Sequence, residues 1–305
     1  MKFEVTILGS SSATPIFNRN PTAQALNIND RLYLIDCGEG TQQQMLRFDI
    51  KASKIDHIFI SHLHGDHYLG LIGLLSSLHL NGRIKPLHIY CPPHLKEIID
   101  IQLLYSETTI QYPLEYRFTD AQKIEVLLDN QDITVETIPL NHRIACTGFL
   151  FKEKKRLRKL MKEKIERLGV PIPNYSALKK GEDYTAPNGD FYKNDTLTTD
   201  SADPKSYAYC SDTMFDEGYF KQITEVTMLY HEATFLNNML DRALETHHTT
   251  ALQAGEIALI VKAKRLLIGH FSARYKTLNE LLEETQSVFP DTELAIEGRT
   301  FIIGE

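Results

Sequence analysis

The sequence is poor in cysteine and has no long apolar run. Only 4 of its 305 residues are cysteines, and they are widely scattered with no CxxC pair: Cys37, Cys91, Cys146 and Cys210. This spacing argues against a structural zinc ribbon or a disulfide framework, and it fits a reducing compartment in which free cysteines pack as small apolar side chains. No stretch is long enough to span a bilayer, and the N-terminus enters a strand-like pattern without signal-peptide anatomy, so we expect a cytoplasmic protein. Because the cysteines are scattered, any metal must be bound by histidine and aspartate.

An excess of positive charge is also missing. The formal net charge of −7 argues against nucleic-acid binding over the whole surface. One segment is nevertheless basic: residues 152–167 hold nine Lys or Arg and three Glu, a local charge of +6, so the rest of the chain carries −13. Contact with a polyanion should therefore be focused on this segment.

Short apolar runs rich in β-branched and aromatic residues recur along the chain and predict strands. They cover residues 3–8, 32–36, 57–61, 87–90, 133–138, 147–151, 206–210, 226–230, 265–269 and 293–297. Helical patterns lie between several of them, at 70–80, 93–104, 251–263 and 278–288. Strands that alternate with helices, but follow one another directly near the middle of the chain, indicate an α/β protein with a mixed sheet or two sheets.

Residues 152–199 differ from the rest of the chain. They open with apolar side chains at helical spacing beneath a basic face, which predicts a helix: Leu157, Leu160, Met161, Ile165 and Leu168. The turn-rich stretches GVPIPNYSALKKG and APNGD follow, with few core residues. We interpret 152–199 as an inserted arm that leaves the body of the protein after one predicted strand and returns before the next. The alternative is a solvated surface helix and loop.

The densest cluster of metal-binding side chains lies in the stretch SHLHGDHYLG, residues 61–70. His62, His64, Asp66 and His67 follow a predicted strand, so they lie on a loop at a strand end. Imidazole nitrogens and carboxylate oxygens are the usual ligands of catalytic zinc and related divalent ions. His62 and His64 can point one way while Asp66 and His67 reach a neighbouring point after the turn, which suits two adjacent metals. A lone HxH arises by chance on protein surfaces, but HxHxDH after a strand is specific.

A short loop cannot complete two metal shells, so further ligands must come from later in the chain. Three candidates each follow a predicted strand: His142, Asp212 and His270. Asp212 is the best bridging ligand, because an aspartate just past a strand can share its two oxygens between two cations. The predicted shells are His62, His64, His142 and Asp212 for one metal, and Asp66, His67, Asp212 and His270 for the other. Four histidines lack such a position, and we expect them to be ordinary surface or core residues: His57, His79, His88 and His94.

These ligands and several other motifs resemble the ribonuclease Z branch of the metallo-β-lactamase superfamily, the tRNA 3′-processing endonucleases. The matching segments cover essentially the whole chain: GSSSATP at 9–15, HLHGDH at 62–67, HEATF at 231–235, HTTALQA at 248–254 and GHFSARY at 269–275. The resemblance implies a single α/β domain over 1–305, built as a four-layer αβ/βα sandwich with the metals at the edge where the two sheets meet. It also implies that the inserted arm at 152–199 is a flexible exosite that grips tRNA.

The resemblance implies a zinc-dependent endoribonuclease that removes the 3′ trailer from precursor tRNA, leaving a 3′-hydroxyl on the tRNA and a 5′-phosphate on the trailer. It further implies two Zn²⁺ per subunit and a homodimer in which one subunit's arm holds tRNA for the other's site. One alternative is another dinuclear phosphodiesterase or arylsulfatase of the same fold. A metal-dependent RNA-binding protein without catalysis is disfavoured, because all the predicted ligands and both members of a candidate acid pair are present.

Three residues are candidates for the acid–base chemistry. Two adjacent metals can lower the pKa of a water and stabilise an in-line displacement, and Asp66 is the candidate to orient or deprotonate that water, which is also the role that the family assigns to it. His248 lies outside the predicted shells and is the candidate proton donor to the leaving 3′-oxygen, with Glu232 holding its other ring nitrogen. His247 is a rival donor, and the resemblance favours His248. Two side chains just past the last ligand either contact phosphate or form a structural salt bridge: Ser272 and Arg274.

Overall fold

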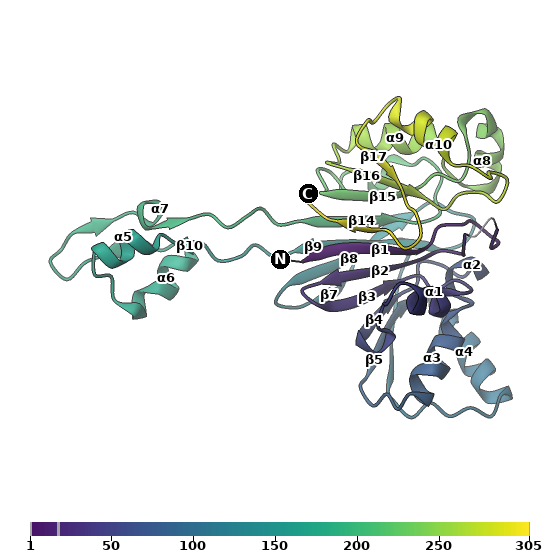
Figure 1. Cartoon of the computed structure of the whole chain (residues 1–305), viewed down its shortest axis with the longest axis horizontal. Coiled ribbons are helices and arrows are strands. Elements are labelled where there is room, and N and C mark those ends of the chain that lie inside the picture. Colours follow the sequence, from purple (N-terminus) through teal and green to yellow (C-terminus); the bar gives the residue numbers. More distant parts are fainter. Residues whose placement is uncertain (1, 17–18, 305) are drawn as a thin grey trace. The chain divides into compact units, whose positions relative to one another are not determined.

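The computed structural model describes residues 2–16 and 19–304, and the chain divides into two compact units (Figure 1). One unit, the body, combines the chain up to Lys152 with the chain from Lys205 onward, and the other, the arm unit, is Glu153–Pro204. Each unit has its own buried apolar core. Within the described ranges, no helix is long and apolar enough to cross a membrane.

The body contains two mixed sheets of seven strands each. The first has the order β18-β1-β2-β3-β4-β5-β6, with the bounds β1 Phe3–Gly9, β2 Ala23–Ile28, β3 Arg31–Ile35, β4 Ile55–Phe59, β5 Leu87–Cys91, β6 Leu114–Phe118 and β18 Thr300–Ile302. The second has the order β17-β16-β15-β14-β9-β8-β7, with the bounds β7 Val126–Asp129, β8 Ile133–Leu140, β9 Cys146–Glu153, β14 Ser206–Cys210, β15 Met228–Glu232, β16 Leu266–Gly269 and β17 Thr292–Leu294. Strands β3 to β6 run parallel, and so do β14 to β17. The α/β class is confirmed, and the structure shows that there are two sheets.

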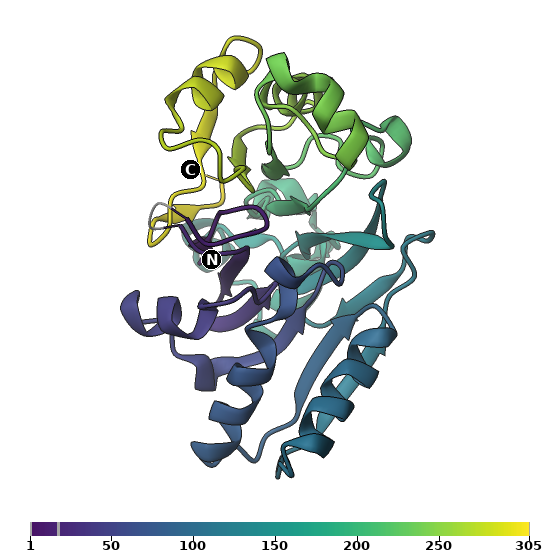
Figure 2. The same ribbon diagram turned by 90° about the vertical axis from the view of Figure 1, so that its right-hand side faces the viewer.

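Helices cover the outer faces of the two sheets, so the body has the layer order helix, sheet, sheet, helix (Figure 2). The helices on the side of the first sheet are α1 Thr41–Arg47, α2 Gly65–Tyr68, α3 Leu71–Leu80 and α4 His94–Tyr105. Those on the side of the second sheet are α8 Leu240–Thr246, α9 Ala251–Ile260 and α10 Asn279–Gln286. Short 3-10 helices occupy Ala52–Lys54, Ile172–Asn174, Glu217–Tyr219 and Asn237–Met239.

The inner faces of the two sheets form an aromatic core. Phe59 of β4 stacks on Tyr90 of β5 with ring centroids 4.4 Å apart, and its edge meets Phe149 of β9 in the other sheet at 5.3 Å. Successive side chains of a strand point to opposite faces, so Ile58 and Ile89 of the same strands pack on the helix side. These contacts fix the two sheets against each other, and they fix the loops at the strand ends as well.

The arm unit is a small fold of its own. Its helices are α5 Lys162–Arg167, α6 Tyr175–Lys180 and α7 Asn194–Leu197, and its paired strands are β10 Lys159–Leu160 with β13 Thr198–Thr199 and β11 Tyr184–Thr185 with β12 Phe191–Tyr192. Buried Ile165, Leu178 and Leu197 pack together at its centre. This core holds together a segment whose turn-rich sequence has few apolar residues.

The prediction of a helix opening at residue 152 is wrong for its first ten residues. Helix α5 begins only at Lys162. Leu160 pairs with Thr198 in the β10–β13 ladder instead, and Arg158 donates from Nε to Thr198 Oγ1 at 2.7 Å. Cations four residues apart, such as Lys154 and Arg158, would repel one another along a helix. Leu157 stays 56% exposed, so no buried apolar face stabilises a helix there.

Most predicted strands and helices are present, with ends shifted by a few residues. The predicted strand at 293–297 ends at Leu294, and beyond it the Glu297 carboxylate accepts a hydrogen bond from the Asn20 amide. The sequence patterns missed strands β2, β6, β7 and β18 and helices α1 and α8.

Candidate active site

The predicted metal ligands all lie where strands of the body end. His62 and His64 follow β4, and Asp66 and His67 lie in the short helix α2 that comes next. His142, Asp212 and His270 follow β8, β14 and β16, respectively. Both sheets therefore contribute ligands to one place, although the ligands come from distant parts of the sequence.

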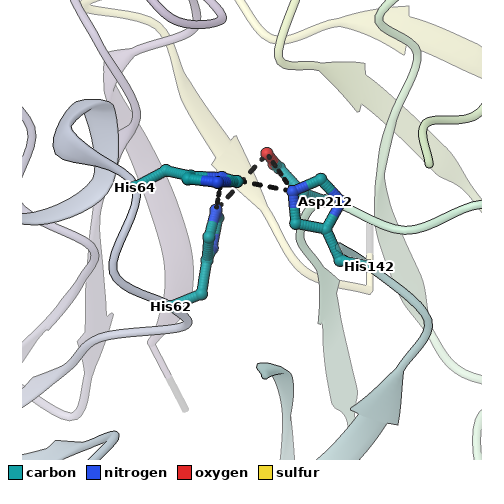
Figure 3. Close-up of side chains that lie close together, drawn as sticks. All are labelled: His62, His64, His142 and Asp212. Atoms are coloured by element: carbon teal, nitrogen blue, oxygen red, sulfur yellow. Dashed lines mark hydrogen bonds and ion pairs between the residues drawn. The ribbon is translucent and has the colours of Figure 1, made fainter. Parts of the chain in front are cut away.

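Four side chains converge on one point from three different loops (Figure 3). His62 Nε2 and His142 Nε2 lie 3.0 and 3.2 Å from His64 Nδ1. Asp212 Oδ2 lies 3.5 Å from His62 Nε2 and 3.8 Å from His142 Nε2. Three nitrogens and one oxygen thus surround a common centre, with all four atoms within 4.8 Å of one another.

A second group lies on the other side of Asp212. Asp66, His67 and His270 also offer ligand atoms within 4.8 Å of one another. Asp212 Oδ1 lies 3.4 Å from His67 Nε2 and 3.2 Å from His270 Nε2, while its Oδ2 faces the first group. Each oxygen of this one carboxylate therefore serves a different group, which is the arrangement of a bridging ligand.

Neighbouring groups fix the rotamer of the ligand imidazoles. His67 Nδ1 donates to Asp36 Oδ2 at 2.8 Å, and His142 Nδ1 donates to the carbonyl oxygen of His247 at 2.9 Å. His270 Nδ1 lies 2.9 Å from Thr234 Oγ1. Each of these bonds leaves Nε2 as the free ring nitrogen, aimed at the centre of its group. Such outer partners set both the tautomer and the orientation of a metal-binding histidine.

The protonation states suit a cation. Burial is the main cause that lowers the pKa of His64 and of His142 to about 4, so both imidazoles are neutral with a lone pair to offer. Burial raises the pKa of Asp66, but the neighbouring His67 and His270 outweigh it and hold that pKa far below its usual value, so the carboxyl is ionised. Neutral imidazole and ionised carboxylate are the forms that bind divalent metals.

Two buried atoms of the second group are without hydrogen-bond partners. His67 Nε2 and Asp212 Oδ1 make no hydrogen bond within the described part of the chain. Burial lowers the pKa of His67, but the carboxylates of Asp212, Asp66 and Asp36 outweigh it and hold that pKa well above its usual value. An excess of buried negative charge beside unpartnered ligand atoms is what a bound cation would satisfy. The residues present therefore fit a divalent metal.

Sequence reasoning missed Asp36, which lies at the end of a predicted strand. Its side chain is fully buried and accepts four hydrogen bonds: from Ser61 N, Ser61 Oγ, Tyr209 OH and His67 Nδ1. Its backbone has a φ of 54°, in the left-handed region. The signal in the sequence was an aspartate at a strand end, the same position that identified Asp212, but no local pattern pairs it with His67.

A second carboxylate–histidine pair lies next to both ligand groups. His248 Nδ1 donates to Glu232 Oε1 at 2.8 Å, and Glu232 is fully buried and also accepts from the Thr213 amide at 2.9 Å. Burial lowers the pKa of His248, but the Glu232 carboxylate outweighs it and raises that pKa to about 9. The His248 ring lies 5.1 Å from the His142 ring and 5.4 Å from the His270 ring. A protonated imidazole therefore faces the place where the two groups meet.

The structure brings His248, and not His247, to Glu232. His247 has a φ of 54° and contributes its backbone carbonyl to His142, as described above. Arg274 donates to Ser272 Oγ at 3.2 Å and lies over the Phe235 ring at 5.1 Å, and no acidic side chain pairs with it in residues 2–16 and 19–304. The histidines expected to be ordinary contact other groups, among them Tyr90, Gln111, Glu115 and Glu97.

The ligand groups open into a pocket of about 310 Å³, the catalytic pocket, whose lining includes Asp66, Asp212, His248, Ala13 and Arg143. The Ala13 amide donates to Asp66 Oδ2 at 2.7 Å, and Ala13 has a φ of 60°. A non-glycine residue in the left-handed region is uncommon. Here the strained turn aims a backbone N–H at a predicted ligand.

Fold and site together define a class: this is a metal-dependent hydrolase of the metallo-β-lactamase fold. The structure of YhfI from Bacillus subtilis, a metallo-β-lactamase fold protein, matches with a TM-score of 0.69 over 99% of each chain at 18% identity. The structure of human tRNase Z, short form, matches with a TM-score of 0.70 over 98% of this chain and 99% of that one, at 26% identity. The family model described as Anti-Pycsar protein Apyc1 matches residues 3–157.

Curated relatives identify the family. Ribonuclease Z of Bacteroides fragilis is 45% identical over 97% of this chain and 98% of its own length. Ribonuclease Z of Cytophaga hutchinsonii is 47% identical over 100% of this chain and 97% of its own length. The chain belongs to the ribonuclease Z family.

Proposed function

We propose that the protein is a zinc-dependent endoribonuclease that removes the 3′ trailer from precursor tRNA. Cleavage leaves a 3′-hydroxyl on the tRNA and a 5′-phosphate on the trailer. The observation that carries this proposal is the Asp212 carboxylate, which directs one oxygen to each of two ligand groups in a chain of the ribonuclease Z family.

The ligand groups suit two Zn²⁺ ions per subunit. His62, His64, His142 and Asp212 would hold one ion, and Asp66, His67, Asp212 and His270 would hold the other. Imidazole nitrogen and carboxylate oxygen are ligands that zinc prefers. When bound, two such ions supply Lewis acidity to the phosphoryl group and lower the pKa of water.

The chain's own residues supply orientation and a proton. Asp66, whose Oδ2 the Ala13 amide holds at 2.7 Å, orients or deprotonates the attacking water. The bond between phosphorus and the 3′-oxygen then breaks. Because Glu232 occupies Nδ1 of His248, the proton that the leaving 3′-oxygen needs comes from His248 Nε2. The negative Glu232 keeps His248 charged until that transfer.

The arm unit supplies the tRNA-binding surface in this proposal. The basic stretch 152–167 lies, except for Lys152, at the start of this unit, and the net charge of the whole chain is −7. Lys and Arg bind the phosphates of a structured RNA without reading its sequence. We extend the proposal to residues 152–199 as a flexible exosite, to a homodimer in which one subunit's arm serves the other's site, and to a cytoplasmic location, which the four free cysteines support.

The test is cleavage of a tRNA transcript with a 3′ extension by the purified protein loaded with zinc. We expect one cut after the discriminator nucleotide, the first unpaired nucleotide on the 3′ side of the acceptor stem, with a 3′-hydroxyl on the tRNA. A 2′,3′-cyclic phosphate at the cut would contradict hydrolysis by water, and an intact transcript together with rapid hydrolysis of a small phosphodiester or aryl sulfate would favour the rival hydrolases of this fold.

A further inference from the structure

A second hollow opens beside the catalytic pocket. It has a volume of about 680 Å³ and is lined by the loop residues 121, 122 and 124, by residues 139–145, and by Asp216 and Gly218. Arg143 lines both this hollow and the catalytic pocket, and it directly follows the predicted ligand His142. The two spaces are therefore neighbours that share one side chain.

Arg143 has no partner of its own. Its exposed guanidinium makes no hydrogen bond, ion pair or ring contact with any residue that the structure describes. The carboxylate of Asp216 in the same hollow is already engaged, since it accepts from Asn141 Nδ2 at 2.9 Å and from the Gly218 amide at 2.8 Å. An arginine presents five N–H donors and is always charged. Beside a site that cuts a phosphodiester, such a group is available for a phosphate.

Two exposed isoleucines line the hollow together with Arg143. Ile124 is 60% exposed and Ile144 is 39% exposed, and both line the hollow. Gln122 lines it as well, and its side-chain amide makes no hydrogen bond within residues 2–16 and 19–304. Exposed apolar side chains with a free amide beside them suit the flat face and polar edge of a nucleobase.

On the basis of the proposed function, we propose that this hollow binds the nucleotide next to the cleaved phosphodiester. Arg143 binds the phosphate that joins this nucleotide to the cut, and Ile124 and Ile144 contact its base. A strand of RNA whose phosphate lies at the ligand groups must leave the catalytic pocket in two directions, and the hollow shares the exposed Arg143 side chain with that pocket. The occupant is a single-stranded nucleotide: either the last one of the tRNA or the first one of the trailer.

Arg143→Ala tests the phosphate contact. Loss of a hydrogen bond to a charged group corresponds to about tenfold to a hundredfold, so we expect kcat/KM for a precursor tRNA to fall by that factor, mainly through KM. For bis(p-nitrophenyl) phosphate, which has no neighbouring nucleotide, the factor by which kcat/KM decreases should be at least ten times smaller than for the precursor. The matched control is Arg31→Ala, which removes an exposed arginine at the start of β3, away from the strand ends that hold the ligands. Zinc content and melting temperature of both variants exclude unfolding as the cause.

Each outcome decides the inference. If Arg143→Ala cuts the precursor as fast as wild type, or loses equal factors on both substrates, the nucleotide site is wrong while the proposed function stands. If the wild-type protein hydrolyses the small diester but leaves the precursor intact, the proposed function is wrong, and the nucleotide site that rests on it is wrong as well. Arg143→Lys keeps the positive charge and should cleave the precursor faster than Arg143→Ala. Equal rates for these two variants would show that the charge does not bind the phosphate.

Ile124→Ser and abasic substrates identify the occupant. Ile124 lies far from the ligands along the chain, and its replacement should raise KM severalfold for the intact precursor. One precursor lacks the base of the last tRNA nucleotide, and another lacks the base of the first trailer nucleotide. If the missing base is the one that normally occupies the hollow, wild type and Ile124→Ser should have the same KM for that abasic precursor. If the variant differs from wild type by the same factor on both abasic substrates, no base binds there.

Discussion

Replacement of Asp36 separates the outer support of the metal site from the ligands themselves. The Asp36 carboxylate is fully buried and holds His67 Nδ1 at 2.8 Å, and it touches no other predicted ligand of the second group. In Asp36→Asn the side chain keeps its size, and its carbonyl can still accept from the Ser61 amide. Its NH₂ group then faces the donors Tyr209 OH and Ser61 Oγ, together with His67 Nδ1.

Two effects of different size follow from this geometry. Loss of an outer partner of a metal-binding histidine lowers metal affinity about 10- to 100-fold, and we expect this loss for the ion held by Asp66, His67, Asp212 and His270. The second effect is on folding. Asp36→Ala leaves three buried donors without this acceptor, namely Ser61 N, Tyr209 OH and His67 Nδ1, whereas Ser61 Oγ still has His62 Nδ1 at 3.0 Å. Each unsatisfied group costs about 1–3 kcal/mol, so the alanine variant should lose at least about 3 kcal/mol in the free energy of unfolding.

The assay is competition between the protein and a chromophoric zinc chelator, with the two sites fitted separately. We expect one site of Asp36→Asn to weaken and the site of His62, His64 and His142 to change much less. Tyr209→Phe is the matched control, because it removes another donor to the same carboxylate oxygen and leaves His67 held. Wild-type affinity at both sites of Asp36→Asn would refute the reasoning, and so would an equal loss in Tyr209→Phe.

Four further changes have defined outcomes. Asp212→Ala should lose zinc as well as activity, and two tightly held ions per chain after dialysis would rule out a bridging carboxylate. His248→Ala should keep both ions while kcat falls about 10²- to 10⁴-fold, the usual contribution of a general acid; unchanged turnover would move the role to His247. Because Lys152 and Ser206 are paired across β9 and β14, a two-residue Asn-Gly turn can replace Glu153–Lys205. This deletion should abolish cleavage of precursor tRNA, while small phosphodiesters are still hydrolysed. Cleavage of precursor tRNA at the wild-type rate would refute the role of the arm as an exosite. Burial raises the pKa of Glu297 from 4.5 to about 7, so between these pH values the native state keeps a proton that the unfolded chain has released. The free energy of unfolding should therefore fall as the pH rises through this range. The urea midpoints at about pH 5 and about pH 8 should differ less in Glu297→Gln than in wild type, and an equal difference would refute the pKa shift.

The strands that line the site were predictable because their signals are local. Runs such as HIFIS and SYAYC are apolar, β-branched or aromatic, and they end where a polar ligand follows. Edge strand β6 lacks such a continuous apolar run: Leu114–Phe118 alternates apolar and charged residues, the pattern of a half-buried strand, and its pairing with β5 decides that it is one. The helix expected at 152 failed for a related reason, since helical spacing of apolar residues does not show whether anything packs on them.

The sequence by itself determined the class of the fold, the residue types that bind the metals and the order in which these residues follow their strands. Histidine and aspartate at strand ends belong to a local pattern of neighbouring residues, and such a pattern can be recognised in the sequence alone. Only the tertiary structure decided which side chains meet. The hydrogen bonds of Asp36 with His67 and of Glu232 with His248, rather than with His247, join residues that are apart in the chain, and Arg143 lines two spaces that separate segments enclose. Their geometry depends on how two sheets pack through a shared aromatic core, and no stretch of sequence contains that packing.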